Sequence, residues 1–107
     1  MKVVKFKKHF ISEILSGSKN TTWRLFDDKD LSVGDEIELV EKESLSKFGE
    51  AKIVDIVNKN IEELSPQELL EHGYDNVNRM IEGHKLYYGD QVDLKTQVKI
   101  IQFELHK

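Results

Sequence analysis

Apolar residues follow two different periods along the chain, and each change of period marks a predicted element. Residues 3–6 form a short β-branched run that is typical of a strand. In the next ten residues, apolar side chains recur three and four positions apart, as on one face of a helix: Phe10, Ile11, Ile14 and Leu15. Gly17 then stands where a left-handed residue would end that helix. The pattern predicts a strand followed directly by a short helix.

Residues 20–25 read as a second extended segment, in which side chains would alternate between two faces. One face would carry Asn20, Thr22 and Arg24. The other face would carry Thr21, Trp23 and Leu25. We therefore expect a buried indole at Trp23, with the Thr22 hydroxyl and the Arg24 guanidinium facing an open or polar space together.

The middle of the chain reads as loops and strands. Residues 27–30 form a polar loop, and a turn at 33–35 leads into a strand through residues 37–39. Residues 41–47 form a polar connection, and apolar side chains around Asp55 predict a further strand over 50–57.

The clearest local signal is the sequence Ser65-Pro66-Gln67-Glu68, which has the form of a capping box. Ser65 can accept from the amide of Glu68, Glu68 can accept from the amide of Ser65, and Pro66 suits the first helical position. A short helix should run from here to about His72 and stop at Gly73.

A second helix should follow, capped by Asp75 or Asn76 and ended by residues 89–90. Its apolar side would consist of Val77, Met80, Ile81 and Tyr88. Residues 97–105 alternate in the manner of a closing strand.

The predicted order is strand, helix, three or more strands, two helices and a strand. Helices inserted between short strands, without regular strand-helix alternation, indicate an α+β domain built on a small twisted or barrel-like sheet. A chain of 107 residues is about the size of one compact domain.

Composition narrows the classes of site and the expected location. The chain has no cysteine, which excludes disulfides, thiolate nucleophiles and Cys-rich metal sites. Its four histidines are scattered without the spacing of a helix-borne metal site, so we expect no metal. No run approaches the ~20 apolar residues of a membrane helix, and the amino terminus lacks a secretory signal. We expect a cytoplasmic protein that does not associate with membranes.

The net charge of −4 conceals an uneven distribution. Residues 1–25 contain six basic residues against one acidic residue, Glu13, and this leaves residues 26–107 strongly acidic. A positive field at this end would attract phosphates or nucleotides. Solvated lysines that serve solubility remain an equally good interpretation.

The basic end includes the run 17–24, Gly-Ser-Lys-Asn-Thr-Thr-Trp-Arg, which is rich in reactive groups. A Thr22 hydroxyl is a poor nucleophile unless a base takes its proton. Lys19 could be that base if burial or a nearby cation such as Arg24 lowers its pKa. The alternative interpretation is an exposed loop lysine and a strand threonine with no chemical role.

Four features, in order along the chain, resemble the ASCH domain, a family related in fold to the PUA domains of RNA-modifying proteins. The first is a helix ending in Gly and followed by Lys, Thr and Arg, at 14–24. The others are a Gly-Asp turn into a strand at 34–37, an acidic connection at 61–65, and a Gly-Tyr pair at 73–74 followed by a helix ending in Tyr at 87–88. The resemblance covers nearly the whole chain and implies one ASCH-like domain over residues 1–107, with a small PUA-like β-barrel.

Small members of this family include an amidohydrolase that acts on N(4)-acetylcytidine, so the resemblance implies this activity without a cofactor. Carried over by position, Lys19 is the proton acceptor and Thr22 the nucleophile. Glu71 is the proton donor after a one-residue shift, whereas an ungapped match puts His72 there. Asn20 and Arg24 would contact the ligand.

A non-catalytic RNA-binding module of the PUA-like type is the alternative function. In that case the run from Lys19 to Arg24 would hold a phosphate or a flipped base, with no need for an acid at Glu71. The expected partner is a modified nucleoside in the first case and RNA in the second.

Overall fold

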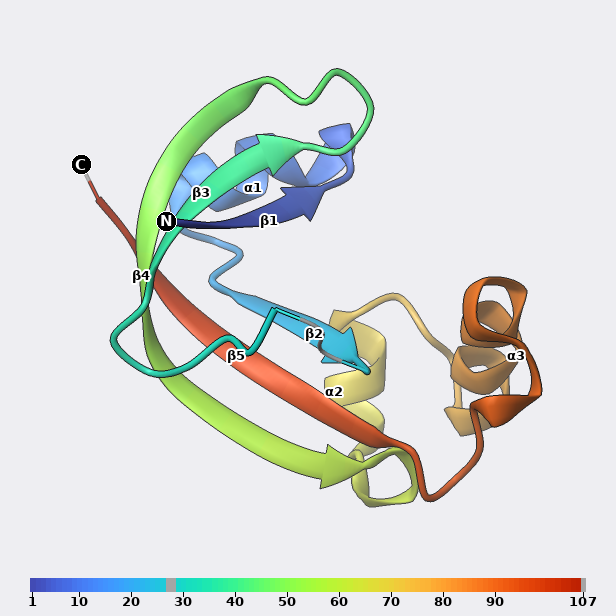
Figure 1. Cartoon of the computed structure of the whole chain (residues 1–107). Helices are drawn as coiled ribbons and strands as arrows, with labels where there is room; N and C mark the ends of the chain where they lie inside the picture. Colours follow the sequence, from blue (N-terminus) through green and yellow to red (C-terminus); the bar gives the residue numbers. More distant parts are fainter. Residues whose placement is uncertain (27–28, 107) are drawn as a thin grey trace. The chain divides into compact units, whose positions relative to one another are not determined.

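The computed structural model describes residues 1–26 and 29–106, and Figure 1 shows the arrangement of its elements. In chain order the elements are β1 (Lys2–Phe6), η1 (Lys8–Phe10), α1 (Ile11–Ser16), β2 (Thr21–Leu25), β3 (Glu36–Glu41), β4 (Lys47–Asn60), η2 (Ile61–Glu63), α2 (Pro66–Glu71), α3 (Val77–Tyr88), η3 (Gly89–Gln91) and β5 (Gln97–Leu105). This order confirms the predicted sequence of strands and helices. Part of the predicted loop at 27–30, namely Asp27 and Asp28, lies outside the described residues.

The five strands form one mixed sheet in the order β1-β3-β4-β5-β2. β1 pairs with β3 in parallel, with Lys2 opposite Ile37, and β3 pairs with β4 in antiparallel fashion. β1 and β2 are the last strands of the order, so each pairs on one side within the sheet. The protein therefore has the small α+β, PUA-like fold that the sequence predicted.

Contacts divide the chain into two compact units. The first comprises Met1–Val57 with Ile100–Lys107, and the second comprises Asn58–Lys99. Both boundaries fall inside strands, one in β4 and one in β5. The single domain over residues 1–107 stays a prediction, and the two units are described separately below.

The core of the first unit lies between α1 and the sheet. Ten buried side chains form one cluster: Val4, Phe6, Ile14, Leu31, Ile37, Leu39, Ala51, Ile53, Ile101 and Phe103. The Phe6 ring packs against Phe103 with a centroid distance of 5.9 Å. Burial of these side chains is the main source of stability for this unit.

The predicted apolar face of α1 is only partly correct. Ile14 is buried and Phe10 is half-buried against the core, but Leu15 is 50% exposed. A helix of six residues makes fewer than two turns, so one position faces the sheet fully and its neighbour does not.

The second unit is built on capped helices. Ser65 Oγ accepts from the amide of Glu68 at 3.1 Å, and Glu68 Oε1 accepts from the amide of Ser65 at 3.0 Å, which confirms the capping box. Asn76 caps α3 through a 3.0 Å hydrogen bond from the amide of Arg79.

The apolar side predicted for α3 holds at its centre and fails at its end. Met80 is fully buried, and Val77 and Ile81 are half-buried. Tyr88 is 38% exposed because it is the last residue of the helix, where its ring stacks on His84.

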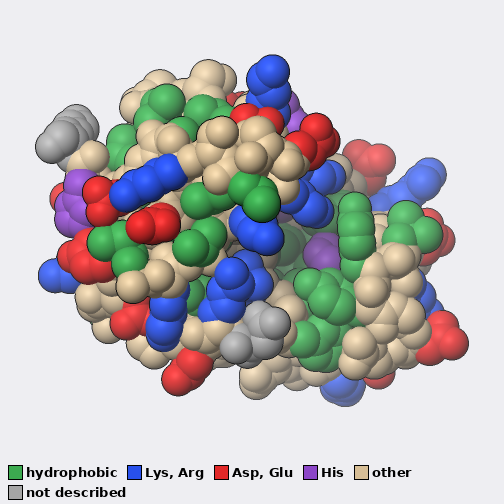
Figure 2. All heavy atoms as spheres, turned by 45° about the horizontal axis from the view of Figure 1, so that its top comes forward, with side chains coloured by type: hydrophobic (Ala, Val, Ile, Leu, Met, Phe, Trp, Pro, Cys, Tyr) green, Lys and Arg blue, Asp and Glu red, His purple; other side chains and the backbone are tan. Residues whose placement is uncertain are grey.

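Charged side chains of both signs are interspersed over the face shown in Figure 2. None of the helices within residues 1–26 and 29–106 has the length and apolar character that crossing a membrane requires.

Candidate functional site

The loop between α1 and β2 is fixed by the carbonyl end of the helix. Gly17 adopts φ +87°, a left-handed conformation that glycine tolerates, and its amide donates to the Ile14 carbonyl at 3.1 Å. The Glu13 carbonyl accepts from the Lys19 amide at 3.0 Å and from the hydroxyls of Ser16 and Ser18, each at 3.1 Å. These bonds hold Lys19 at a defined place before β2 begins.

The Lys19 amine is half-buried rather than exposed. It donates to the carbonyl oxygen of Thr21 at 3.0 Å and lies 4.8 Å from the centroid of the Phe10 ring. Burial lowers the pKa of Lys19 from its usual value, while the charge of Glu13 acts in the opposite direction. Sequence analysis left open whether burial or a nearby cation would lower the pKa of Lys19. In the structure the cause is burial.

The three other predicted residues of the first unit follow along β2. Asn20 is exposed, and its carbonyl accepts from the Phe103 amide at 2.9 Å, which joins the start of β2 to β5. Thr22 and Arg24 are half-buried within β2. Because a strand places alternate residues on one face, these two side chains share a face of β2.

The predicted burial of Trp23 is wrong, since its side chain is half-buried like those of its neighbours in β2. Four of the five residues of this strand are half-buried, and only Leu25 is buried. β2 has five residues and is the last strand of the sheet order, so it has a neighbouring strand on one side only.

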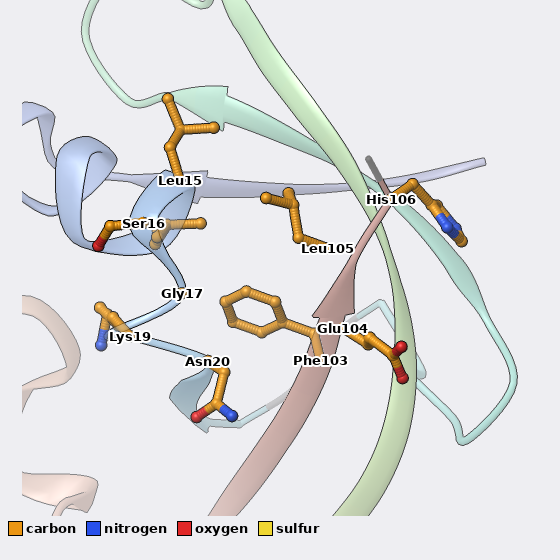
Figure 3. A pocket seen from close by; sticks show the side chains of 10 residues that line it. Leu15, Ser16, Gly17, Lys19, Asn20, Phe103, Glu104, Leu105 and His106 are labelled. Carbon is orange, nitrogen blue, oxygen red and sulfur yellow. The ribbon is translucent and has the colours of Figure 1, made fainter.

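A hollow of about 580 Å³ lies between α1, the following loop and the end of β5. Figure 3 shows Phe103 and Leu105 extending from β5 into this space, with the Lys19 amine directed away from Phe103. Lys19 and Asn20 line the hollow, whereas Thr22 is not among the described residues that do. Sequence analysis missed Phe103 and Leu105, although their alternation in the closing strand was a usable signal.

The two candidates for the acid belong to the second unit. Glu71 is the exposed last residue of α2 and accepts from the Gln67 side chain at 3.4 Å. His72 follows as the C-cap of that helix and is half-buried. Lys19 and Thr22 lie three positions apart on one loop and strand. The convergence of their side chains with each other and with Glu71 stays a prediction.

Over residues 1–26 and 29–106, no group of three His, Asp or Glu side chains is arranged to hold a metal ion. The predicted site residues supply an amine, a hydroxyl, an amide, a guanidinium and, on α2, a carboxylate.

A single mixed sheet with one helix after the first strand and two before the last defines a small α+β domain of the PUA-like class. Within this class the chain has the fold of the ASCH domains. The ASCH domain from Lactobacillus crispatus JV V101 superposes with a TM-score of 0.69 at 11% identity, over 97% of this chain and 79% of that one.

Two further solved structures are similar to this chain. Protein EF3133 from Enterococcus faecalis V583 has a TM-score of 0.70 at 14% identity, over 97% of this chain and 78% of that one. Protein PF0455 from Pyrococcus furiosus has a TM-score of 0.63 at 18% identity, over 99% of this chain and 97% of that one. No protein-family model and no curated protein matches the sequence. The likeness confirms the expected fold.

Proposed function

We propose that the chain is a cytoplasmic amidohydrolase of the ASCH family that acts on N(4)-acetylcytidine or a related modified nucleoside. One observation carries the proposal: a half-buried Lys19 with a lowered pKa, fixed three residues before Thr22 in a hydrogen-bonded strand. A lysine is a useful base only when part of it is neutral near the working pH, and burial favours the neutral form.

In the proposed reaction the Lys19 amine takes the proton of the Thr22 hydroxyl. The Thr22 oxygen attacks the acetyl carbonyl carbon, and the bond between that carbon and N4 breaks. Glu71 donates a proton to N4, which releases cytidine. In the second half of the reaction, Glu71 takes a proton from a water molecule, whose oxygen attacks the acetyl-threonine ester. The bond between the acetyl carbon and the Thr22 oxygen breaks, the Lys19 ammonium returns its proton to that oxygen, and acetic acid leaves. The steps assigned to these side chains use no metal.

Arg24 and Asn20 would bind the ligand in this proposal. The Arg24 guanidinium, on the same face of β2 as Thr22, can donate two parallel hydrogen bonds to a cytosine carbonyl or a phosphate. Asn20 contributes an exposed amide at the edge of the hollow.

The activity is tested by incubating purified protein with N(4)-acetylcytidine and measuring the release of cytidine. Lys19→Ala and Thr22→Val should each lower kcat/KM by about 100-fold or more, because they remove the base and the nucleophile. Thr22→Ser keeps a hydroxyl and should retain part of the activity. Lys8→Ala, which removes an exposed lysine of η1, is the matched control and should behave as the parent protein. Turnover that is unaffected by Lys19→Ala would overturn the proposal.

The identity of the acid needs a separate comparison. Glu71→Gln should lower kcat if Glu71 is the proton donor, whereas His72→Asn should do so if the donor is the neighbouring imidazole. Glu82→Gln, on the exposed side of α3, serves as the control.

A non-catalytic RNA-binding module is the second candidate, and the exposed basic side chains of Lys5, Lys7 and Lys8 favour it. Binding to single-stranded RNA should then weaken steeply as salt is raised, with losses on charge reversal at Lys19 and Arg24. RNA binding that ignores both charge reversals would exclude this role for the run from Lys19 to Arg24.

A further inference from the structure

Three side chains of the first unit, those of His9, Phe10 and Lys19, lie against one another. The His9 and Phe10 rings have a centroid distance of 4.1 Å, and the Lys19 amine lies 4.8 Å from the Phe10 centroid. An ammonium at this distance from a ring centroid is within the range of a cation–π interaction. Phe10 is thus a direct neighbour of the proposed base.

Phe10 is itself held in place from two directions. Its amide donates to the Lys7 carbonyl at 3.0 Å, which closes the turn of η1. Its ring is half-buried against the core cluster of the first unit. A ring fixed by the backbone and by the core is a rigid surface, so it can define where a flexible lysine side chain lies.

Two backbone carbonyl groups also hold Lys19. Its amide donates to the Glu13 carbonyl, and its amine donates to the Thr21 carbonyl at 3.0 Å. A lysine has many rotamers, and one hydrogen bond to a carbonyl leaves much of that freedom. The ring of Phe10 supplies the remaining restraint.

We propose that Phe10 is a positioning residue for Lys19: its ring covers one side of the amine, excludes water there and directs the amine along β2 towards Thr22. This inference rests on the proposed function in that Lys19 is taken as the base. The contact between the Phe10 ring and the Lys19 amine does not depend on the reaction.

Several groups around the amine act on its protonation in opposite senses. Burial favours the neutral amine, whereas the face of the ring and the Glu13 carboxylate on α1 favour the ammonium. A positive charge on His9, whose ring centroid lies 4.1 Å from that of Phe10, would favour the neutral amine. The pKa of Lys19 is lowered, so the balance lies on the side of burial.

Two substitutions of Phe10 should therefore change the pKa of Lys19 differently. Phe10→Leu keeps an apolar cover but loses the ring face, so the pKa of Lys19 should stay low or fall further. Phe10→Ala admits water to the amine, so the pKa of Lys19 should rise towards its usual value. Phe48→Leu is the matched control, because Phe48 also packs against the core but from β4, and it should leave the pKa of Lys19 unchanged.

Two measurements on the intact chain test the inference without turnover. Competitive acetylation of lysines across a pH series, read by mass spectrometry, reports the pKa of Lys19 against that of exposed Lys8. Proton NMR reports an upfield ring-current shift of the Lys19 ε-methylene, which should be present in the parent protein and lost in Phe10→Leu. If turnover occurs, kcat/KM of Phe10→Ala should fall at neutral pH and recover at high pH, where the amine is neutral.

An unchanged pKa of Lys19 in a folded Phe10→Ala variant would overturn the inference. If that variant does not fold, the absence of a ring-current shift in the parent protein overturns it instead. A protein that shows the expected pKa values and shifts but releases no cytidine would contradict the proposed function and leave the role of Phe10 standing.

Discussion

At the scale of single residues, Lys19 carries an electrostatic cost and Leu45 a conformational one. Lys19 keeps an amine half-buried, which disfavours its charged form. Leu45 has φ +61°, a left-handed conformation that strains a residue with a branched side chain, and it is 61% exposed at the tip of the β3–β4 connection. The cost at Lys19 is explained by its proposed role as a base. The strain at Leu45 is not offset by burial of its side chain in the core.

We expect Lys19→Met to raise Tm at neutral pH, because it removes the cost of holding an ammonium in a half-buried site. The pKa of Lys19 is lowered in the folded protein, so between that value and 10.5 the unfolded chain binds more protons. The parent protein should therefore gain stability relative to Lys19→Met as pH rises through this window. Thermal unfolding at neutral pH and near pH 10.5 checks both points, and Lys8→Met is the control.

We expect Leu45→Gly to stabilise the protein by about 1 kcal/mol, since glycine adopts a positive φ without the clash of a Cβ. The hydrogen bond from the residue 45 amide to the Glu41 carbonyl, at 2.9 Å, should be retained. Glu43→Gly in the same connection should give no gain, because residue 43 lacks a positive φ. Equal effects of the two substitutions in urea unfolding would contradict the strain argument.

At the scale of elements, α2 begins with a reciprocal side-chain cap, whereas α3 begins with a single side-chain hydrogen bond to Asn76. The box at Ser65 and Glu68 is joined by an ion pair from Lys59, whose Nζ lies 2.9 Å from Glu68 Oε1. The amide of Ser65 and the side chain of Lys59 hold the pKa of Glu68 below its usual value. The start of α2 is therefore defined by local chemistry.

Ser65→Ala should lower the free energy of unfolding by about 1 kcal/mol, because the Glu68 amide loses its acceptor. Ser65→Asp should restore most of the loss, as aspartate also caps. Ser12→Ala, at an exposed position of α1, is the control for loss of a hydroxyl.

The contribution of Glu68 to stability should depend on pH. A carboxylate whose pKa is lowered by folding stabilises the folded state above its unfolded pKa, near 4.5 for Glu68, and loses this contribution as pH falls through the lower folded value. The parent protein should therefore exceed Glu68→Gln in stability at neutral pH, and the difference should disappear in acid. A constant difference across unfolding experiments in this range would contradict the linkage.

Elements with local signals could be predicted from the sequence, whereas the ends of β4, which depend on pairing within the sheet, could not. The start of α2 and the stop of α1 at Gly17 follow from neighbouring residues alone. The strand predicted at 50–57 runs over Lys47–Asn60, because pairing with β3 and β5 extends it through polar positions. The short η2 was missed, although Asn60 and Glu63 form a capping box that the sequence displays.

At the scale of the whole molecule, the two compact units share β4 and β5, which are neighbours in the sheet. Each boundary falls within a continuous strand rather than in a linker. Domain boundaries usually lie in exposed and flexible segments.

We expect the chain to unfold in one cooperative transition, as the single-domain prediction requires. Calorimetric and van't Hoff enthalpies should agree, and Met80→Ala in the second unit should shift the same transition as Ile53→Ala in the first. Each substitution empties a fully buried position and should cost 2–5 kcal/mol. Two transitions that respond separately to these substitutions would divide the chain into two domains.

The residues of the candidate site differ in how far apart they lie in the sequence. Lys19, Thr22 and Arg24 could be proposed together because they lie in one run of sequence, and their roles stay predictions. Phe10 was placed among the apolar residues of a helix, and its contact with Lys19 depends on how the loop after Gly17 returns along α1. Glu71 is some 50 residues away from Thr22, so local sequence reasoning leaves its role open.

Because β2 is the last strand of the sheet order, deuterium exchange can report whether a ligand is bound to it. A last strand has a neighbour on one side only, so its ladder opens more readily than that of a central strand and its amides exchange faster. A ligand bound along Thr22 and Arg24 would shield those amides and slow their exchange. Deuterium uptake in the peptide spanning β2 would thus report binding of a nucleoside even in a variant that cannot turn it over.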